Sequence, residues 1–476
     1  MSARSRGREA DESDEPRSTD LRSPPIDDLI AAARNVPDTS NAQWLEALLA
    51  RNAETAYLRR HGSPRTLEAF RDAVPVASYE DLQPWLARIH EGEPDVLFSG
   101  RPIAFERTGG STGAAKLIPY SAEGLCDFQH SVLPWLADVV KTNRITGRMY
   151  FSISPATRIP DSIGGIPVGL PDGAYLGEAG ASLLAHMTAV PFEVSAIADV
   201  SRWRDETLRH LTAARDLELI SVWSPTFLLR LLDHVEDPRS LWPRLKVVSC
   251  WASGASRPFA EEVAARLPHA HLQPKGLLST EAVVTVPDES DSPTLTRHGF
   301  FELEREGQLR LPHEVTAGDV CEVVVTTASG LYRYRTGDFV RCDGRSAAGR
   351  PVFEFVGRGT HVSDLVGEKL TEPFVEACLS HVPGFRLLVP EAHRNGYVLV
   401  TETDQPVDVE SVERRLCDNP QYAYARRLGQ LETLRLLTVP RLFDRYTQAH
   451  VEQGSRLGDV KPVALRSERA WLARLG

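Results

Sequence analysis

Two long segments in the first third of the chain have apolar residues at the spacing of an amphipathic helix. In segment 41–62, Trp44 and Leu48 belong to an apolar stripe that recurs every three or four residues. Segment 121–141 repeats this pattern behind Ser121, a residue type that favours the N-terminal cap of a helix. Both segments are therefore predicted to form helices that bury one face.

The middle of the chain alternates β-rich and helical runs. Apolar strand-like patterns occupy segments 148–154 and 244–252, whereas segments 221–235 and 257–267 have helical patterns. This alternation predicts βα units around a largely parallel sheet. Strand patterns separated by glycine-containing turns then follow one another closely over 308–357, which predicts an antiparallel section.

The pattern restarts in the last quarter of the chain. Segment 385–440 reads as strand, strand, helix and strand, which predicts a small module of its own. The first residues mix both charge signs and have few apolar side chains to bury, so we expect a disordered tail. The fold class is α/β, with a large N-terminal domain of mixed, partly parallel sheets flanked by helices plus a β-rich section, followed by a small C-terminal α/β domain. The expected divisions are 1–25, 26–358 and 359–476, with the boundary at Gly359 and Thr360.

Composition and charge narrow the class of protein. The 476 residues are 42% hydrophobic and 25% charged, as in ordinary globular proteins. The net charge of −11 gives no general attraction to nucleic acid or to an anionic membrane surface. No run approaches the roughly 18 apolar residues of a membrane span, and the N-terminus lacks the apolar stretch of a signal peptide, so a cytoplasmic protein is expected. The six cysteines form no C-x-x-C pair, which favours reduced thiols over a disulfide framework or a zinc site.

Segment 105–116 has the composition of a phosphate-binding loop. Small hydroxyl and glycine residues let backbone N–H groups turn toward phosphate oxygens, and Lys116 adds a positive charge. The P-loop of nucleoside triphosphatases is excluded, because apolar residues flank Lys116 where that motif needs a glycine and a hydroxyl. Residues 109–113 also fit the G-x-S-x-G nucleophile elbow of serine hydrolases. That elbow must lead straight into a helix, and Pro119 interrupts the chain before the predicted helix begins.

Several signatures in chain order resemble one known family. Segment 108–116 resembles the first signature of the adenylate-forming superfamily, with Gly109 where a serine is usual. The later segments are similar to the auxin-responsive acyl acid amido synthetases, in particular their bacterial members. The match runs over residues 44–461, and signatures in the correct order are far more specific than any one of them. The later segments are 241–255, 275–287, 331–342, 353–372 and 419–431.

The resemblance implies a site for ATP and Mg²⁺. Ser111, Thr112 and Lys116 would contact the β- and γ-phosphates and neutralise charge as pyrophosphate leaves. Thr280 would approach the α-phosphate, and Glu281 would hold the metal ion through a carboxylate oxygen.

The same resemblance implies contacts to the base and the ribose. Asp338 would accept hydrogen bonds from both ribose hydroxyls, and Arg358 would lie near the ribose and phosphate. Leu277 and Ala282 depart from the superfamily, which usually has an aromatic residue and a glycine there. The implied nucleotide-binding set is Thr108, Ser111, Thr112, Gly113, Lys116, Ser253, Gly254, Ala255, Ser279, Thr280, Asp338 and Arg358, of which Ser253, Gly254 and Ala255 would line the adenine.

The small domain is expected to bring Lys461 to the carboxylate and the α-phosphate, where an ammonium group can bridge both anions. Lys461, Thr280 and Lys116 are therefore the expected catalytic residues. The family's small domain rotates between two reaction steps, and Gly359 falls at the expected hinge. Candidates for the acyl pocket are Trp223, Ser224, Pro225, Phe227 and Gly165.

The implied activity is a two-step ligation. ATP activates a carboxylic acid as an acyl-adenylate, and an amine, expected to be an amino acid, then attacks the carbonyl to give an amide. An acyl-CoA ligase or a carrier-protein loading enzyme would share the first step, and a non-catalytic nucleotide- or acyl-binding protein on the same scaffold is an alternative of another class. Neither nucleic acid nor a membrane is an expected partner.

Overall fold

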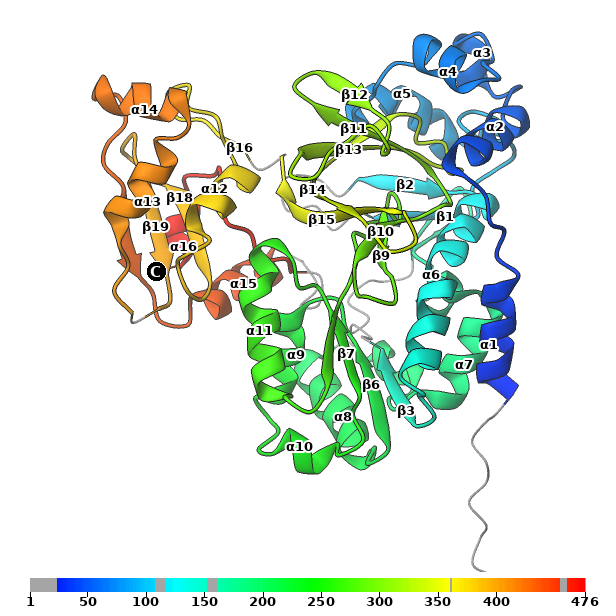
Figure 1. Cartoon of the computed structure of the whole chain (residues 1–476), viewed down its shortest axis with the longest axis horizontal. Helices are drawn as coiled ribbons and strands as arrows, with labels where there is room; N and C mark the ends of the chain where they lie inside the picture. The colour runs from blue at the N-terminus through cyan, green and yellow to red at the C-terminus, as the bar shows by residue number, and fades with distance from the viewer. Residues whose placement is uncertain are drawn as a thin grey trace, which may run out of the picture.

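The computed structural model describes residues 24–107, 116–151, 161–170, 172–197, 199–359, 362–403, 405–453 and 460–475. Figure 1 shows a large N-terminal part and a smaller C-terminal part joined beside strand β15. None of the described helices is long and apolar enough to cross a membrane. The six cysteines are free, as the sequence predicted.

Five helices begin the described chain; the first lies along the side of the large domain, and the next four cover one end of it (Figure 1). The single helix expected over 41–62 is instead two, because the side chain of Thr55 accepts a hydrogen bond from the N–H of Leu58 and so caps a new helix. Asn52, at the break, donates from its side chain to the hydroxyl of buried Tyr332 at 2.9 Å. The helices are α1 (Pro24–Arg34), α2 (Asn41–Arg51), α3 (Ala56–Arg60), α4 (Leu67–Ala73) and α5 (Tyr79–His90).

A parallel sheet forms the lower part of the large domain in Figure 1, as the alternating pattern predicted. Its order is β3 (Arg148–Phe151), β6 (Leu217–Ser221), β7 (Val247–Cys250) and β8 (His271–Pro274), all parallel. The two central strands, β6 and β7, are buried throughout, as in a sheet covered on both faces. The helices in this part are α8 (Val200–Ala213), α9 (Pro225–Leu232), α10 (Pro238–Leu241) and α11 (Arg257–Arg266).

A seven-stranded antiparallel sheet confirms the β-rich section. Its long central pair is β14 (Tyr334–Arg345) and β15 (Pro351–Arg358). The order is β12-β11-β13-β14-β15-β10-β9, with β9 (Thr285–Pro287), β10 (Pro293–Leu295), β11 (Phe300–Arg305), β12 (Gln308–Arg310) and β13 (Val320–Thr326).

A third, four-stranded sheet lies beside the long helix α6 (Ala122–Thr142). The side chain of Ser121 accepts a hydrogen bond from the N–H of Gly124, which confirms the predicted cap. The sheet has the order β2-β1-β5-β4, made of β1 (Ala104–Arg107), β2 (Leu117–Tyr120), β4 (Asp161–Ile163) and β5 (Ile166–Val168). The remaining elements here are η1 (Asp172–Leu176), α7 (Gly177–Met187) and η2 (Phe192–Ala196).

The C-terminal module contains a three-stranded sheet in the order β18-β19-β20. The single helix expected within segment 385–440 is two helices, because Asn419 caps a new one and Pro420 occupies its first turn. Leu399 and Val412 belong to the core of this module. Its elements are β16 (Val362–Ser363), β17 (Leu370–Thr371), α12 (Glu372–Leu379), β18 (Arg386–Pro390), β19 (Tyr397–Thr401), α13 (Val409–Leu416), α14 (Pro420–Arg427), β20 (Arg435–Thr438), α15 (Leu442–Glu452) and α16 (Trp471–Leu475).

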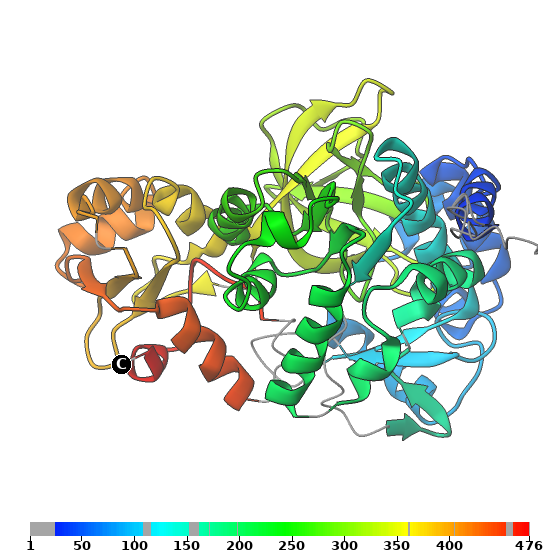
Figure 2. The same ribbon diagram turned by 90° about the horizontal axis from the view of Figure 1, so that it is seen from below.

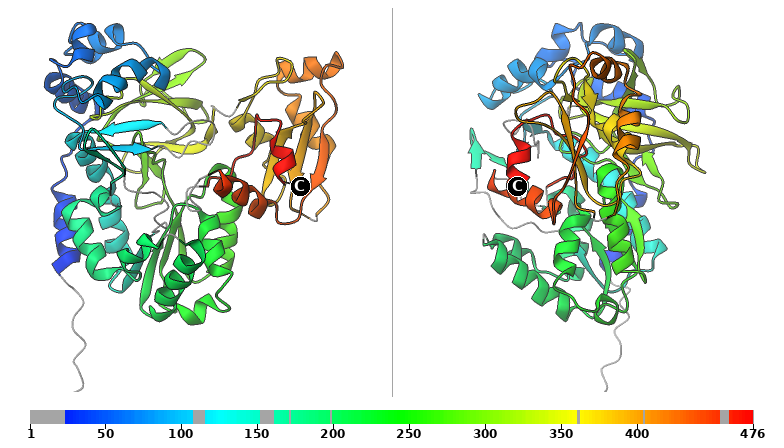
Figure 3. Two further views of the ribbon diagram at one scale, coloured as in Figure 1. Left: turned by 180° about the vertical axis from the view of Figure 1, so that it is seen from behind. Right: turned by 90° about the vertical axis from the view of Figure 1, so that its left-hand side faces the viewer.

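The two parts share a hydrophobic cluster. Figures 2 and 3 show α15 reaching from the C-terminal module toward the helices of the parallel sheet. The ring of Phe259 on α11 lies 4.6 Å from that of Phe443 and 5.7 Å from that of Phe385, between centroids. Arg230 on α9 also pairs with Asp444 on α15. This contact holds the C-terminal module beside the carboxyl ends of the parallel strands.

Candidate functional site

One cleft collects predicted site residues from distant parts of the sequence. It is narrow, with about 80 Å³ of space that a water-sized molecule can reach. Its walls come from the ends of β7, β8 and β15 and from the segment that follows α15. The predicted residues that line it are Ser253, Ala255, Ser279, Asp338, Arg358 and Lys461, together with Leu277.

Asp338 and Arg358 form a charged pair on one wall of the cleft. They face each other in the register of β14 and β15, and Arg358 Nε donates to Asp338 Oδ1 at 2.8 Å. Asp338 is only 2% exposed. Its carboxylate raises the pKa of Arg358, and the charge of Glu281 acts in the same direction. A carboxylate held in this position can accept further hydrogen bonds from a ligand.

Ser279 and Ala282 close a tight turn that presents Thr280 and Glu281 at its tip. The N–H of Ser279 donates to Ala282 O at 3.0 Å, and the N–H of Ala282 donates to Ser279 Oγ at 3.3 Å. Tyr120 Oη donates to Thr280 O at 2.7 Å and so ties the turn to β2. Thr280 and Glu281 are thus held by a turn between two strands rather than at the start of a helix.

Lys116 lies where β2 begins, directly after the phosphate-loop signature. Its Nζ donates to Tyr334 Oη at 3.2 Å, which places it beside the strand that carries Asp338. The Nζ also lies 5.1 Å from the ring centroid of Tyr79. Thr108, Ser111, Thr112 and Gly113 lie outside the described residues.

The segment after β7 turns sharply into α11. Gly254 has φ of +55°, a left-handed conformation that glycine adopts without steric cost. Ser253 and Ala255 flank this turn and line the cleft. The predicted adenine-lining segment is therefore a glycine-dependent turn at the carboxyl end of a parallel strand, where ligands bind in open α/β sheets.

The C-terminal module contributes Lys461 to the cleft. Lys461 Nζ lies 4.7 Å from the ring centroid of Trp251, which follows β7. The backbone carbonyl of Lys461 accepts a hydrogen bond from Tyr446 Oη at 2.9 Å. Lys461 thus enters the cleft across the contact between the two parts of the molecule.

Glu372 is a cleft residue that the sequence analysis did not single out. It is 5% exposed and begins α12. One carboxylate oxygen accepts from the N–H of Arg358 and the other from the N–H of Ala464, both at 3.2 Å. Burial, the largest influence, raises its pKa to about 7. A glutamate in the first turn of a helix is common, so the sequence held no signal for this bridge between β15 and the segment after Lys461.

Lys275 is a second such residue. It follows β8, lines the cleft and is 8% exposed. The sequence analysis predicted no strand over 271–274 and so gave no reason to single out a lysine that follows it.

The proposed acyl-pocket residues do not lie together. Trp223 is 38% exposed and its ring centroid lies 6.1 Å from that of Trp251, beside the cleft. Ser224, Pro225 and Phe227 are buried at the start of α9, and Phe227 packs against Trp203 in the core. Gly165 lies in the turn between β4 and β5 with open space around its Cα. Of these five residues, the structure brings Trp223 nearest to the cleft.

A second cavity adjoins the turn that carries Glu281. Glu281 lines it together with Tyr120 and residues of α6. Asp127, His130 and His298 offer potential metal-ligand atoms within 4.8 Å of one another, and Asp127 and His298 line the cavity. Burial raises the pKa of Asp127 to about 6 and lowers that of His298 to about 4. Hard cations prefer carboxylate oxygens such as those of Glu281, whereas the His-containing cluster has ligands suited to transition metals.

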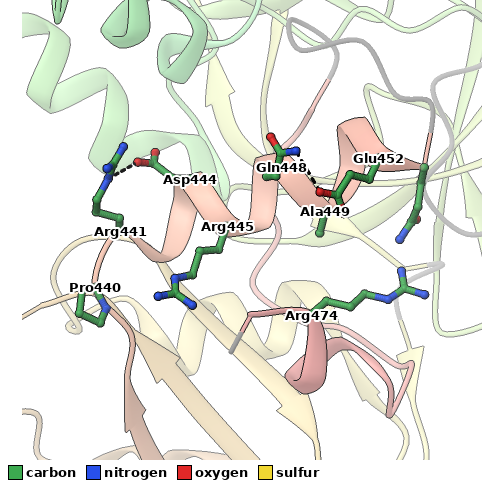
Figure 4. A pocket seen from close by; sticks show the side chains of 9 residues that line it. Pro440, Arg441, Asp444, Arg445, Gln448, Ala449, Glu452 and Arg474 are labelled. Carbon is green, nitrogen blue, oxygen red and sulfur yellow. Dashed lines mark hydrogen bonds and ion pairs between the residues drawn. The ribbon is translucent and has the colours of Figure 1, made fainter.

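A further pocket lies on the C-terminal module, away from the cleft. Figure 4 shows charged side chains of α15 and Arg474 around it, with Arg441 bonded to Asp444 and Gln448 bonded to Glu452. Among its described lining residues, none belongs to the predicted site.

Three family models match the chain in order. The GH3 family N-terminal domain matches residues 27–240, the GH3 family central domain matches 293–358, and the GH3 family C-terminal domain matches 371–470. Together these matches span most of the sequence.

Curated relatives from plants carry consistent names. The chain is 27% identical over 421 residues to a probable indole-3-acetic acid-amido synthetase GH3.1 of Oryza sativa subsp. japonica, covering 71% of this chain and 68% of the relative. It is 26% identical to a putative indole-3-acetic acid-amido synthetase GH3.10 of the same species, covering 72% of this chain and 86% of the relative.

A solved structure shares the fold. AtGH3.15 acyl acid amido synthetase in complex with 2,4-DB superposes with a TM-score of 0.78 at 20% identity, covering 94% of this chain and 95% of that one. The ordered match of all three domain models, with these relatives, shows that the chain belongs to the GH3 family.

Proposed function

We propose that the chain is an ATP-dependent acyl acid amido synthetase that joins a carboxylic acid to an amino acid and releases AMP and pyrophosphate. Family membership supports the amide-forming ligase chemistry, and the relatives' names supply the substrate classes, an acyl acid and an amino acid. The observation that carries the proposal is the single cleft lined by Asp338, Ser279 and Lys461, which come from three separate segments.

The first step needs charge stabilisation where phosphate charge builds up. A carboxylate oxygen of the acid attacks the α-phosphorus of ATP, and pyrophosphate leaves. In the proposal Lys116 and Lys461 supply positive charge from opposite parts of the molecule, and Thr280 contacts the α-phosphate. Glu281 would hold Mg²⁺, which supplies further charge neutralisation to the phosphates when it is bound.

In the proposal the nucleotide is positioned by β14 and by the turn after β7. Asp338, held by Arg358, accepts hydrogen bonds from the ribose hydroxyls, and the turn at Gly254 lies against the base. Leu277 lies in the cleft wall and offers an apolar surface where an aromatic ring is usual in the superfamily.

The second step is attack of the amine on the acyl-adenylate carbonyl, with loss of a proton from nitrogen and departure of AMP. No covalent bond to the enzyme is needed, so the residues act by positioning and charge. In the proposed division, residues 26–358 bind ATP and acid, and residues 359–476 bring Lys461 to the cleft for adenylation.

The test is acid-dependent exchange of labelled pyrophosphate into ATP, followed by product analysis. Purified protein is given ATP, Mg²⁺ and a panel of carboxylic acids, then each standard amino acid or coenzyme A. We expect exchange with at least one acid and an amide product with an amino acid. A thioester with coenzyme A and no amide would contradict the amido synthetase assignment, and absence of both exchange and AMP binding would indicate a scaffold without catalysis.

A further inference from the structure

Lys275 occupies an aromatic box at the carboxyl end of the parallel sheet. Its Nζ donates to Ser221 Oγ at 2.8 Å, at the end of the neighbouring strand β6. The same Nζ lies 4.7 Å from the ring centroid of Trp135 on α6 and 5.1 Å from that of Trp223. A hydroxyl group and two indole faces therefore surround the ammonium group.

Lys275 has no acidic partner among the described residues. The ion pairs of the described chain join none of its carboxylates to Lys275. Other buried charges in the same domain are paired: Arg333 donates twice to Glu302, and buried Glu218 pairs with Lys246. Leaving a buried ammonium without a counter-ion is costly, and a protein that keeps one usually uses it.

The electrostatics of Lys275 favour the binding of an anion. Burial lowers the pKa of Lys275 to about 7. The nearby Cys250 has a smaller, opposite effect and raises this pKa. A negatively charged ligand beside the ammonium group would favour its protonated form and offset the cost of burial.

The position of Lys275 relates it to the reaction. It lines the same cleft as Ser279 and Lys461. The indole centroids of Trp223 and Trp251 lie 6.1 Å apart. Lys461 Nζ in turn lies over the ring of Trp251. Each lysine therefore contacts one of two neighbouring tryptophans, Lys275 from the large domain and Lys461 from the C-terminal module.

We propose that Lys275 and Ser221 bind the carboxylate of the acid substrate, with Trp135 and Trp223 packing against its carbon skeleton. This inference rests on the proposed function and adds the group that recognises the acid before it is activated. Adenylation removes the negative charge of the carboxylate, so Lys275 attracts the free acid more strongly than the acyl-adenylate. The indole walls favour acids with a flat apolar or aromatic body.

The experiment measures binding of acids and of their neutral amides to the full-length protein. Benzoate, phenylacetate and indole-3-acetate are titrated by calorimetry beside benzamide, phenylacetamide and indole-3-acetamide, with AMP as a separate ligand. We expect wild-type protein to prefer at least one acid over its amide by about 10-fold or more, the effect of a charge-assisted hydrogen bond in a buried site. In Lys275→Met this preference is lost, whereas AMP affinity is unchanged.

The comparison of acid with amide separates recognition of charge from damage to the pocket. A distorted pocket would weaken both members of a pair equally, whereas loss of the cation weakens the acid alone. Lys141→Met, at an exposed position on α6, is the matched control and should keep the preference. Thermal unfolding of Lys275→Met checks the fold, and its midpoint should equal or exceed that of wild type because an unpaired buried charge is replaced by an apolar chain of similar shape.

Three outcomes would overturn the inference. The mutant could keep the acid preference, it could lose AMP affinity to the same extent as acid affinity, or wild-type protein could bind AMP but none of the acids. In the last case the nucleotide part of the proposed function would still stand. Failure of the wild-type protein to bind AMP or to exchange pyrophosphate would instead contradict the proposed function itself.

Discussion

Arg358 Nε donates to Asp338 Oδ1 at 2.8 Å across the antiparallel pair β14 and β15, and the two residues are direct register partners. The backbone N–H of Arg358 donates in turn to Glu372 of the C-terminal module. One arginine therefore connects a cleft carboxylate to the junction between the two parts of the chain. A change at Asp338 should consequently affect ligand binding, whereas a change at Glu372 should affect the stability of the junction.

Asp338→Asn should weaken AMP binding by about 10-fold or more. An asparagine amide has one accepting oxygen where the carboxylate has two, and it loses the charged pair with Arg358. Calorimetric titration with AMP measures the effect. Asp343→Asn, an exposed position on the same strand, serves as the control. Equal AMP affinity in Asp338→Asn and wild type would reduce Asp338 to a structural residue of the turn.

Glu281→Gln should lower acid-dependent pyrophosphate exchange on the order of 100-fold at a fixed Mg²⁺ concentration, since it removes a metal-binding charge at constant shape. Exchange rates over a Mg²⁺ titration measure it. The exposed Glu289→Gln is the comparison variant and should behave as wild type. A wild-type rate and Mg²⁺ dependence in Glu281→Gln would remove Glu281 from the metal site.

The fold class was predictable because its signals are local. Apolar patterns identified β3 and β7 of the parallel sheet and β12 to β15 of the antiparallel sheet, and Ser121 marked the start of α6. Two helix boundaries were missed for a physical reason. A cap at Thr55 and a proline at position 420 each restart a helix within a continuous apolar pattern, and periodicity alone does not register such a break.

Lys461→Ala should separate the two half-reactions. Pyrophosphate exchange should slow by about 100-fold, because charge builds up at the α-phosphate only in the first step. Amide formation from supplied acyl-adenylate should change less than about 2-fold by the same reasoning. Rapid-mixing measurements of each step decide it, with the exposed Lys141→Ala as control. Equal slowing of both steps would contradict a role restricted to adenylation.

Gly359→Ala should destabilise the junction between the two parts. A Cβ at this position would lie 2.1 Å from Cε2 of Phe339, and the N–H of Gly359 donates to Gly337 O at 2.7 Å, so the backbone has little room to shift. We expect a loss of about 1–3 kcal/mol in unfolding free energy by denaturant titration. Adding Phe339→Ala should remove most of that penalty.

The matched control for this pair is Gly173→Ala, where a new Cβ would lie 3.8 Å from Ala181 Cβ, an ordinary van der Waals contact. That variant should unfold at the wild-type denaturant concentration. If Gly359→Ala costs as much in the Phe339→Ala background as alone, the clash is not the cause of the destabilisation.

Stability should depend on pH through Glu372. Its pKa in the folded protein is raised from 4.5 to about 7, mainly by burial, so the folded state binds a proton more tightly than the unfolded state. The resulting stabilisation is complete below about pH 4.5 and is lost as pH rises through about 7, a change on the order of 3 kcal/mol. Unfolding free energies of wild type and Glu372→Gln across this range should converge in acid and diverge toward neutrality. Parallel curves would contradict the assignment.

The candidate site was predictable only in part, for reasons of distance. Asp338, Ser279 and Lys461 could be named from short signatures, but only the folded chain brings them to one cleft. Lys275 and Glu372 belong to no pattern of spacing, because their roles depend on burial and on partners far away in sequence. Phe227 was proposed for a pocket but lies in the core, since the apolar residues of α9 serve packing.

The ring of Phe259 packs against Phe385 and Phe443 of the C-terminal module. Phe259 also lies one turn after the glycine-dependent bend that lines the cleft. Separation of the two parts would expose these rings to water, and apolar exposure carries a positive heat-capacity change. The hydrophobic part of this attraction weakens on cooling, so the balance between the joined and separated arrangements becomes temperature-dependent. A chain built in this way would change its preferred arrangement with the temperature of its surroundings, independently of any ligand.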